Sequence, residues 1–250
     1  MDIWKIIRII RNIALVILGL MIILALVVFF APQAYMAVDT KVSYLVNKQS
    51  GMYEMPIIRD IENASDKFNK FERVSRFGLK FSAPWTNMQT VKEGNATLEL
   101  KFDNNKVLRL VYYEGGFKLV EDLKAKNPNV YKIMVDVDGQ KNFESEFAFC
   151  KYYLESSPQK LSIFSSNSRV TTETTLLSIK KYLIRNAGKG LFIYNNDRIK
   201  AIQYGKPNMG KGEIWIDIFD NKNNRYSMAL PSDNVTQDEI DYILDSIEFE

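Results

Sequence analysis

Few residues of this chain could do chemistry, and the absence of histidine removes the commonest catalytic arrangements. The sequence has no histidine and a single cysteine, Cys150. A Ser-His-Asp or Cys-His nucleophile therefore cannot be built, nor can the usual histidine-rich zinc or iron site. Cys150 stands among Ala148, Phe149 and Tyr152 rather than among bases. The sequence thus predicts a buried, unreactive thiol and no catalytic residue.

Residues 136–139 (DVDG) hold two aspartates before a glycine, a pattern that resembles part of a calcium-binding loop. If Gly139 takes the sixth position of that loop, Met134 and Ser145 take the first and twelfth, where carboxylates are required. The complete motif is therefore absent, and a plain turn is the favoured interpretation. An irregular site completed by Glu144 and Glu146 is the alternative. No metal site and no cofactor is predicted.

Residues 205–212 (GKPNMGKG) form the longest glycine-rich stretch and contain two lysines. They do not match the phosphate-binding pattern G-x-x-x-x-G-K-[ST], and they are expected to join two antiparallel strands. Exposed loops on a rigid scaffold are common places for binding residues. The candidate ligand or partner surface is therefore Tyr204, Lys206, Asn208 and Lys211.

Carboxylates offer a second route to chemistry, because a glycosidase needs only two of them at the right separation in space. The chain has 30 acidic residues, and the sequence alone does not exclude that two of them form such a pair. Trp85 and Trp215 are the only tryptophans beyond the N-terminal region, which is little aromatic surface for a sugar site. A carboxylate-dependent hydrolase or a small-ligand sensor remains the alternative function.

The elements that would position these residues begin with an uncharged segment, residues 12–38. Its length matches a bilayer core of about 30 Å, and it is longer than the apolar region of a signal peptide. Lys5, Arg8 and Arg11 precede it, and Asp39 is the first charge after it. These flanks predict an uncleaved transmembrane helix with a cytoplasmic N-terminus and an extracytoplasmic C-terminal part. A pilin-like subunit is a further alternative, although no cleavage-type glycine precedes the apolar run.

Charge is balanced beyond the predicted anchor. The first 38 residues hold three of the 33 Lys and Arg residues and one of the 30 Asp and Glu residues, which leaves 30 cations and 29 anions. Such a balance argues against binding nucleic acid through bulk electrostatics. A chain with one cysteine cannot form an internal disulfide. Extracytoplasmic proteins without disulfides are common in bacteria.

The predicted fold class is α+β, with the transmembrane helix followed by an extracytoplasmic, mainly antiparallel sheet with flanking helices. We divide the chain into residues 1–38 (basic flank and anchor), 39–75 (connector 40–55, then an amphipathic helix 56–71 that either packs on the domain or binds a partner) and 76–250 (the α+β domain). The strands are expected at 77–85, 97–102, 107–113, 130–137, 162–165, 191–194, 199–204, 213–219 and 225–230. The helices of this domain are expected at 116–126, 142–154 and 171–186 and after a capping box at 236–239.

Two segments resemble a known family. Residues 77–85 (FGLKFSAPW) and 243–249 (ILDSIEF) are similar to the opening strand and the closing helix of the PsbP-like α/β/α sandwich. The resemblance covers residues 77–249 and implies a non-catalytic binding or assembly module, without carrying over any site residue. The predicted function is that of a membrane-anchored envelope protein whose outer domain binds another envelope protein.

Overall fold

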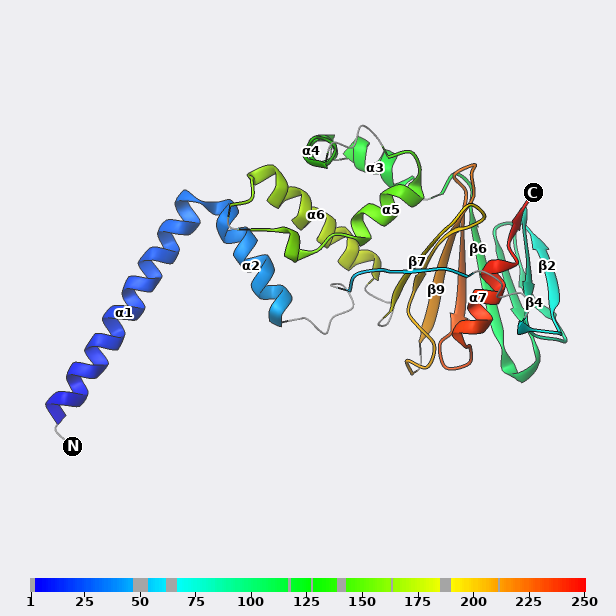
Figure 1. Cartoon of the computed structure of the whole chain (residues 1–250), viewed down its shortest axis with the longest axis horizontal. Helices are drawn as coiled ribbons and strands as arrows, with labels where there is room; N and C mark the ends of the chain where they lie inside the picture. Colours follow the sequence, from blue (N-terminus) through cyan, green and yellow to red (C-terminus); the bar gives the residue numbers. More distant parts are fainter. Residues whose placement is uncertain are drawn as a thin grey trace.

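The computed structural model describes residues 3–46, 54–61, 67–116, 118–126, 128–138, 143–162, 164–184, 190–210 and 212–250. Figure 1 shows an eight-stranded sheet with helices on one side and, on the other, a small sheet with the C-terminal helix. Two N-terminal helices continue beyond the helical side. The α+β class is therefore confirmed.

The large sheet is mixed. Its strand order is β1-β7-β8-β9-β10-β6-β5-β4, and only the edge pair β1 and β7 is parallel among these neighbours. The bounds are β1 Ile57–Arg59, β4 Gln89–Glu93, β5 Thr97–Lys101, β6 Val107–Tyr113, β7 Leu191–Asn195, β8 Lys200–Tyr204, β9 Glu213–Phe219 and β10 Arg225–Pro231. The predicted hairpin and the four late strands are confirmed by β5 to β10.

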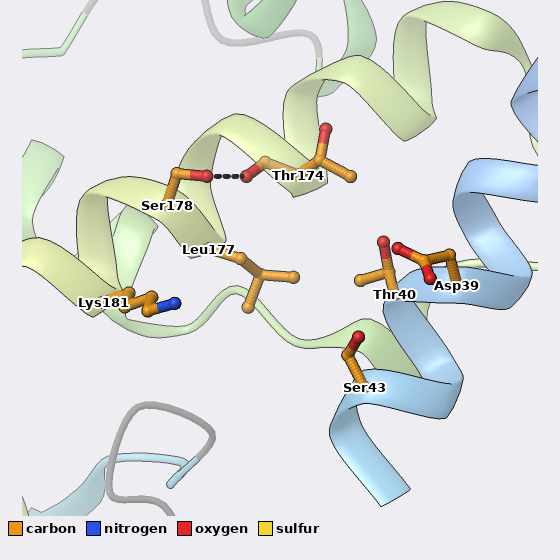
Figure 2. A pocket seen from close by; sticks show the side chains of 7 residues that line it. All are labelled: Asp39, Thr40, Ser43, Thr174, Leu177, Ser178 and Lys181. Atoms are coloured by element: carbon orange, nitrogen blue, oxygen red, sulfur yellow. Dashed lines mark hydrogen bonds between the residues drawn. The ribbon is translucent and has the colours of Figure 1, made fainter. Parts of the chain in front are cut away.

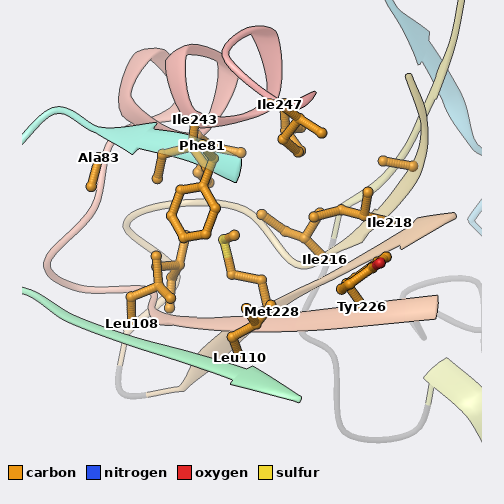
Figure 3. Packing of buried hydrophobic residues seen from close by; sticks show 14 of the residues in the cluster. Phe81, Ala83, Leu108, Leu110, Ile216, Ile218, Tyr226, Met228, Ile243 and Ile247 are labelled. Atoms are coloured by element: carbon orange, nitrogen blue, oxygen red, sulfur yellow. The ribbon is translucent and has the colours of Figure 1, made fainter. Parts of the chain in front are cut away.

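One face of the large sheet packs on α7 (Gln237–Asp245) and on a three-stranded sheet. That sheet has the order β11 (Glu248–Phe249), β3 (Leu79–Ala83) and β2 (Glu72–Arg76). Figure 3 shows Phe81 and Ile243 directed from this layer toward Met228 and Ile216 of the large sheet. Alternate residues of the inner strands supply this apolar core, as the period of two requires. We call this side of the sheet the α7 face.

The opposite face packs on helices, and we call it the helical face. Its helices are α3 (Leu119–Lys126), α4 (Pro128–Asp138), α5 (Glu146–Leu154) and α6 (Asn167–Ile184), with two short 3-10 turns, η3 (Asp103–Asn105) in the β5–β6 hairpin and η4 (Pro158–Lys160) after α5. Phe147 of α5 lies against Phe219 of β9, with ring centroids 5.5 Å apart. Helices α3, α5 and α6 confirm three of the predicted helices.

The N-terminal region contains two helices, α1 (Ile3–Phe30) and α2 (Pro32–Val46). Pro32 stands at the first position of α2, where its missing N–H costs nothing. Ala37 of α2 packs with Leu161 and Val170, and this small cluster holds α2 against α6. Helix α1 extends away from the rest of the chain (Figure 1).

The prediction of a transmembrane helix is contradicted. Across the part of the chain that the structure describes, no helix is both long enough and apolar enough to cross a membrane.

Four local predictions are also wrong. Residues 57–59 form strand β1, so the helix predicted from Pro56 does not begin there, and residues 62–66 lie outside the described residues. Residues 40–46 belong to α2 rather than to a connector. Residues 130–137 lie in helix α4 rather than in a strand, and Ser162, Phe164 and Ser165 are in no strand.

Candidate functional site

The candidate loop after β8 does not present all of its predicted residues to solvent. Tyr204 is buried on the helical face, in the same cluster as Tyr153. Burial raises the pKa of both phenols well above the ordinary value. Tyr204 is therefore a core residue in this structure.

The rest of the loop is tied to the end of β10 by Ser232. The Ser232 N–H donates to the Gly212 carbonyl at 2.9 Å, and its hydroxyl donates to the Gly210 carbonyl at 2.6 Å. The Asn208 N–H donates to the Ser232 carbonyl at 2.7 Å, with Asn208 itself in the left-handed region at a φ of 63°. Lys206 and Asn208 are exposed, and Lys211 lies outside the described residues. This loop surface stays a prediction.

Cys150 is buried in the helical layer, as predicted. Burial is the largest influence on its thiol and raises the pKa of Cys150 to about 12. Since the thiolate is the nucleophilic form, this thiol is unreactive at neutral pH.

The calcium-like segment falls at the end of a helix. Residues 136–138 form the last turn of α4, and Gly139 lies outside the described residues. Within the described part of the chain, no group of three or more Cys, Asp or Glu side chains is placed to hold a metal ion.

A buried charge cluster lies between the large sheet and α5. Arg225 donates to Asp217 at 2.5 Å, and the Ser227 hydroxyl donates to the same carboxylate at 2.5 Å. Glu146 lies 3.8 Å from Arg225, and all four side chains are buried. Burial lowers the pKa of Arg225 but the Asp217 carboxylate raises it, and the net shift is upward. The cluster is internal and ionic, so it joins strand β10 to the helical layer.

Glu146 of this cluster lies so close to the backbone of residue 116 that only glycine fits there. A Cβ at position 116 would lie 1.7 Å from a carboxylate oxygen of Glu146, and Gly116 also has a φ of 68°. Any side chain there would displace Glu146 from the buried cluster.

A second polar network lies under α7. The Tyr194 hydroxyl donates to the side-chain oxygen of Gln203 at 2.6 Å, and the Gln237 amide donates to Asp241 at 3.0 Å. Arg59 of β1 forms an ion pair with Asp241. These groups bind one another beneath the helix, so the network fixes α7 and β1 on the sheet.

A polar groove of about 330 Å³ lies between α2 and α6. Four of its lining residues, Thr174, Leu177, Ser178 and Lys181, come from one face of α6, because their spacing is that of successive helical turns. Asp39, Thr40 and Ser43 of α2 line the other side. Figure 2 shows Lys181 and Asp39 on opposite sides of Leu177.

Helix α1 exposes a continuous run of apolar side chains. Between residues 13 and 26 its large apolar side chains are about half exposed or more, with Leu20 at 61% and Met21 at 63%. A helix with apolar residues on all sides is normally buried against other apolar groups.

Comparisons with known proteins assign no family. No protein-family model matches this chain, and no curated protein matches it. The resemblance to PsbP-like proteins therefore stays a prediction.

Sequence reasoning missed the groove between α2 and α6. The hydroxyl residues of α6 recur at helical spacing, which was a usable signal on that helix alone. Their partners on α2 were assigned to a connector, so nothing in the predicted elements brought residues 39–43 near residues 174–181. The groove depends on contacts between segments more than 130 residues apart.

Proposed function

We propose that this protein is a non-catalytic binding module that joins another protein through helix α1. The observation that carries the proposal is the run of exposed apolar side chains between residues 13 and 26. Contiguous exposed apolar surface on a protein commonly marks an interaction site, because covering it removes that surface from water.

The remaining described structure supports a scaffold rather than a catalyst. Asp217 and Asp241 are held in the interior by ion pairs to Arg225 and Arg59. Cys150 is buried with a raised pKa. These groups stabilise the layers on the two faces of the sheet, and their hydrogen bonds are made within the chain.

A partner groove fits α1 better than a second copy of α1. Two helices that pair with each other bury one stripe of apolar residues, with polar residues on the outside. In α1, Val16, Leu20 and Leu24 form one row, yet Ile17, Met21 and Leu15 beside that row are also exposed. A groove in another protein covers more of the helix circumference than one partner helix does.

The partner is expected to be another envelope protein, as the sequence analysis predicts. Placement outside the cytoplasm stays a prediction, because it was based on a transmembrane helix that is not found in the described part of the chain. The alternative of a carboxylate-dependent hydrolase receives no support from the buried, arginine-paired aspartates.

In-cell crosslinking with mass spectrometry tests the proposal on the full-length protein. The test variant is Leu20→Ser with Leu24→Ser, and the matched control is Val42→Ser, an apolar residue of α2 that is 51% exposed. We expect one reproducible partner that the wild type and Val42→Ser capture equally and that the α1 variant captures at least tenfold less.

Three results would contradict a separate protein partner. One is equal capture by the α1 variant. Another is self-association of the purified protein that accounts for all crosslinks. The third is binding of the purified protein to phosphatidylglycerol vesicles through α1 without any protein partner.

A further inference from the structure

The groove between α2 and α6 differs from an ordinary contact between two helices. Packed helices usually face each other with apolar side chains. Here the facing rows carry Thr40 and Ser43 from α2, and Thr174 and Ser178 from α6. Leu177 is the apolar member of the lining and is buried. The small cluster of Ala37, Leu161 and Val170 holds the helices together.

The hydroxyl groups present acceptors to this groove. The Thr40 hydroxyl donates to the Met36 carbonyl at 2.7 Å, and that of Thr174 donates to the Val170 carbonyl at 2.8 Å. Ser178 donates to the Thr174 carbonyl at 2.9 Å, as Figure 2 also shows. A hydroxyl has one hydrogen and two lone pairs, so these three oxygens can still accept hydrogen bonds.

Two charged side chains complete the lining. Asp39 and Lys181 make no hydrogen bond or ion pair with any other residue that the structure describes. Figure 2 places Asp39 beside Thr40 at one end of the groove, and Lys181 at the other end beyond Leu177. The groove thus has an acidic end at Asp39, a basic end at Lys181, and Leu177 between them.

We propose that this groove binds a short peptide with free termini. Its ammonium group would donate to Asp39 and to the hydroxyl oxygen of Thr40, because an ammonium has three hydrogens and needs several acceptors. Its carboxylate would pair with Lys181 at the far end. The aliphatic part of the peptide would lie on Leu177.

The size of the groove suits a di- or tripeptide. Small-molecule sites usually have volumes of about 300–1,000 Å³, and this groove lies at the lower end of that range. A ligand whose opposite charges are separated by an apolar segment matches the order of side chains along the groove. This site does not involve the exposed surface of α1, so the inference is independent of the proposed partner.

Calorimetric titration of the purified full-length protein with dialanine and trialanine tests the proposal, in a buffer free of zwitterions. The matched negative ligand is N-acetyl-dialanine amide, which keeps the peptide and lacks both charges. We expect the free peptides to bind with a one-to-one stoichiometry and the blocked peptide to bind at least about tenfold more weakly, since charge-assisted hydrogen bonds are the stronger kind.

The protein variants assign binding to the groove. Asp39→Asn and Lys181→Gln should each weaken the binding of trialanine about tenfold or more. The matched controls Asp233→Asn and Lys132→Gln remove exposed charges elsewhere and should leave binding unchanged.

Both groove variants should fold as the wild type does, because Asp39 and Lys181 are exposed. Equal circular dichroism spectra would establish this. The proposal is overturned if neither free peptide binds, if the blocked peptide binds equally well, or if both groove variants retain wild-type affinity.

Discussion

The two faces of the large sheet are built from the same strands but are stabilised differently. On the α7 face, Ile216 and Met228 meet Phe81 and Ile243 in an apolar core. On the helical face, the intervening residues of the same strands include Asp217 and Arg225. Alternation of side chains along a strand allows this division, because neighbouring residues point to opposite faces.

The comparison shows that buried residues of the same strands can form an apolar core on one face and an ionic cluster on the other. Apolar packing on the α7 face is tolerant of small changes in electrostatics. The helical face holds buried ions, which are costly to desolvate and depend on their partners. The helical face should therefore respond most to charge deletion and to pH. The α7 face also has an ion pair, Arg59–Asp241, but it includes a partly exposed arginine of edge strand β1, so this face should respond mainly to packing and capping.

The largest expected effect is the loss of the buried carboxylate on the helical face. Asp217→Ala leaves Arg225 without its 2.5 Å partner and removes the acceptor of the Ser227 hydroxyl. Removing one member of a buried ion pair typically costs about 3–5 kcal/mol in the free energy of unfolding, and Glu146 at 3.8 Å offsets a part of this. Urea denaturation followed by circular dichroism measures the loss.

A combined variant separates charge from packing. Asp217→Ala with Arg225→Met and Glu146→Gln removes all three buried charges of the cluster, so it should recover much of the lost stability. Arg225 also lies over the ring of Phe219, 5.7 Å from its centroid. If the combined variant is less stable than Asp217→Ala alone, Arg225 contributes mainly through this packing, and the contrast between the two faces fails.

The best predicted elements of the fold were those with local signals in the sequence. The alternation in β9 and β10 and the capping box before α7 are local signals, and each specifies its element without distant contacts. Residues 130–137 show the limit of such signals. They are rich in β-branched residues, yet they form helix α4, where Met134 is fully buried. Tertiary packing overrides intrinsic propensity there.

The candidate site was less predictable than the fold for a related reason. Tyr204 was chosen because it adjoins a glycine-rich loop, but its position in β8 directs it into the helical layer. The groove was missed because it forms only where α2 meets α6. A sequence pattern can identify which face of a helix is polar, but it does not identify the segment that this face meets.

The second expected effect is a dependence of stability on pH that comes from Lys180. Its ammonium is fully buried and donates to the Leu154 carbonyl at 2.6 Å, and burial lowers the pKa of Lys180 to about 8. In the unfolded chain the pKa of lysine is about 10.4. Between these values the unfolded state binds more protons, so the free energy of unfolding should rise as the pH rises from about 8 to about 10.

The gain should be at most about 3 kcal/mol, and Lys180→Met should lack it. The measurement is the difference in unfolding free energy between wild type and variant at several pH values from 7 to about 9.5, because unfolded tyrosines begin to ionise near pH 10. A difference that does not change with pH would show that Lys180 titrates normally, and the helical face would then be no more sensitive to pH than the α7 face.

The smallest expected effect lies on the α7 face, at the capping box of its helix. The Thr236 hydroxyl accepts from the Glu239 N–H at 3.2 Å, and the Thr236 N–H donates to the Glu239 carboxylate at 2.7 Å. Thr236→Ala removes only the first bond, because Glu239 is also held by Lys106 at 2.9 Å and by the Trp85 indole N–H at 2.7 Å. We expect a loss of about 1 kcal/mol by urea denaturation, with Thr236→Ser close to wild type and no dependence on pH between 7 and 9. A loss as large as that of Asp217→Ala would mean that docking of α7 depends on its polar cap as strongly as the helical face depends on its ions, and the distinction between the two faces would not hold.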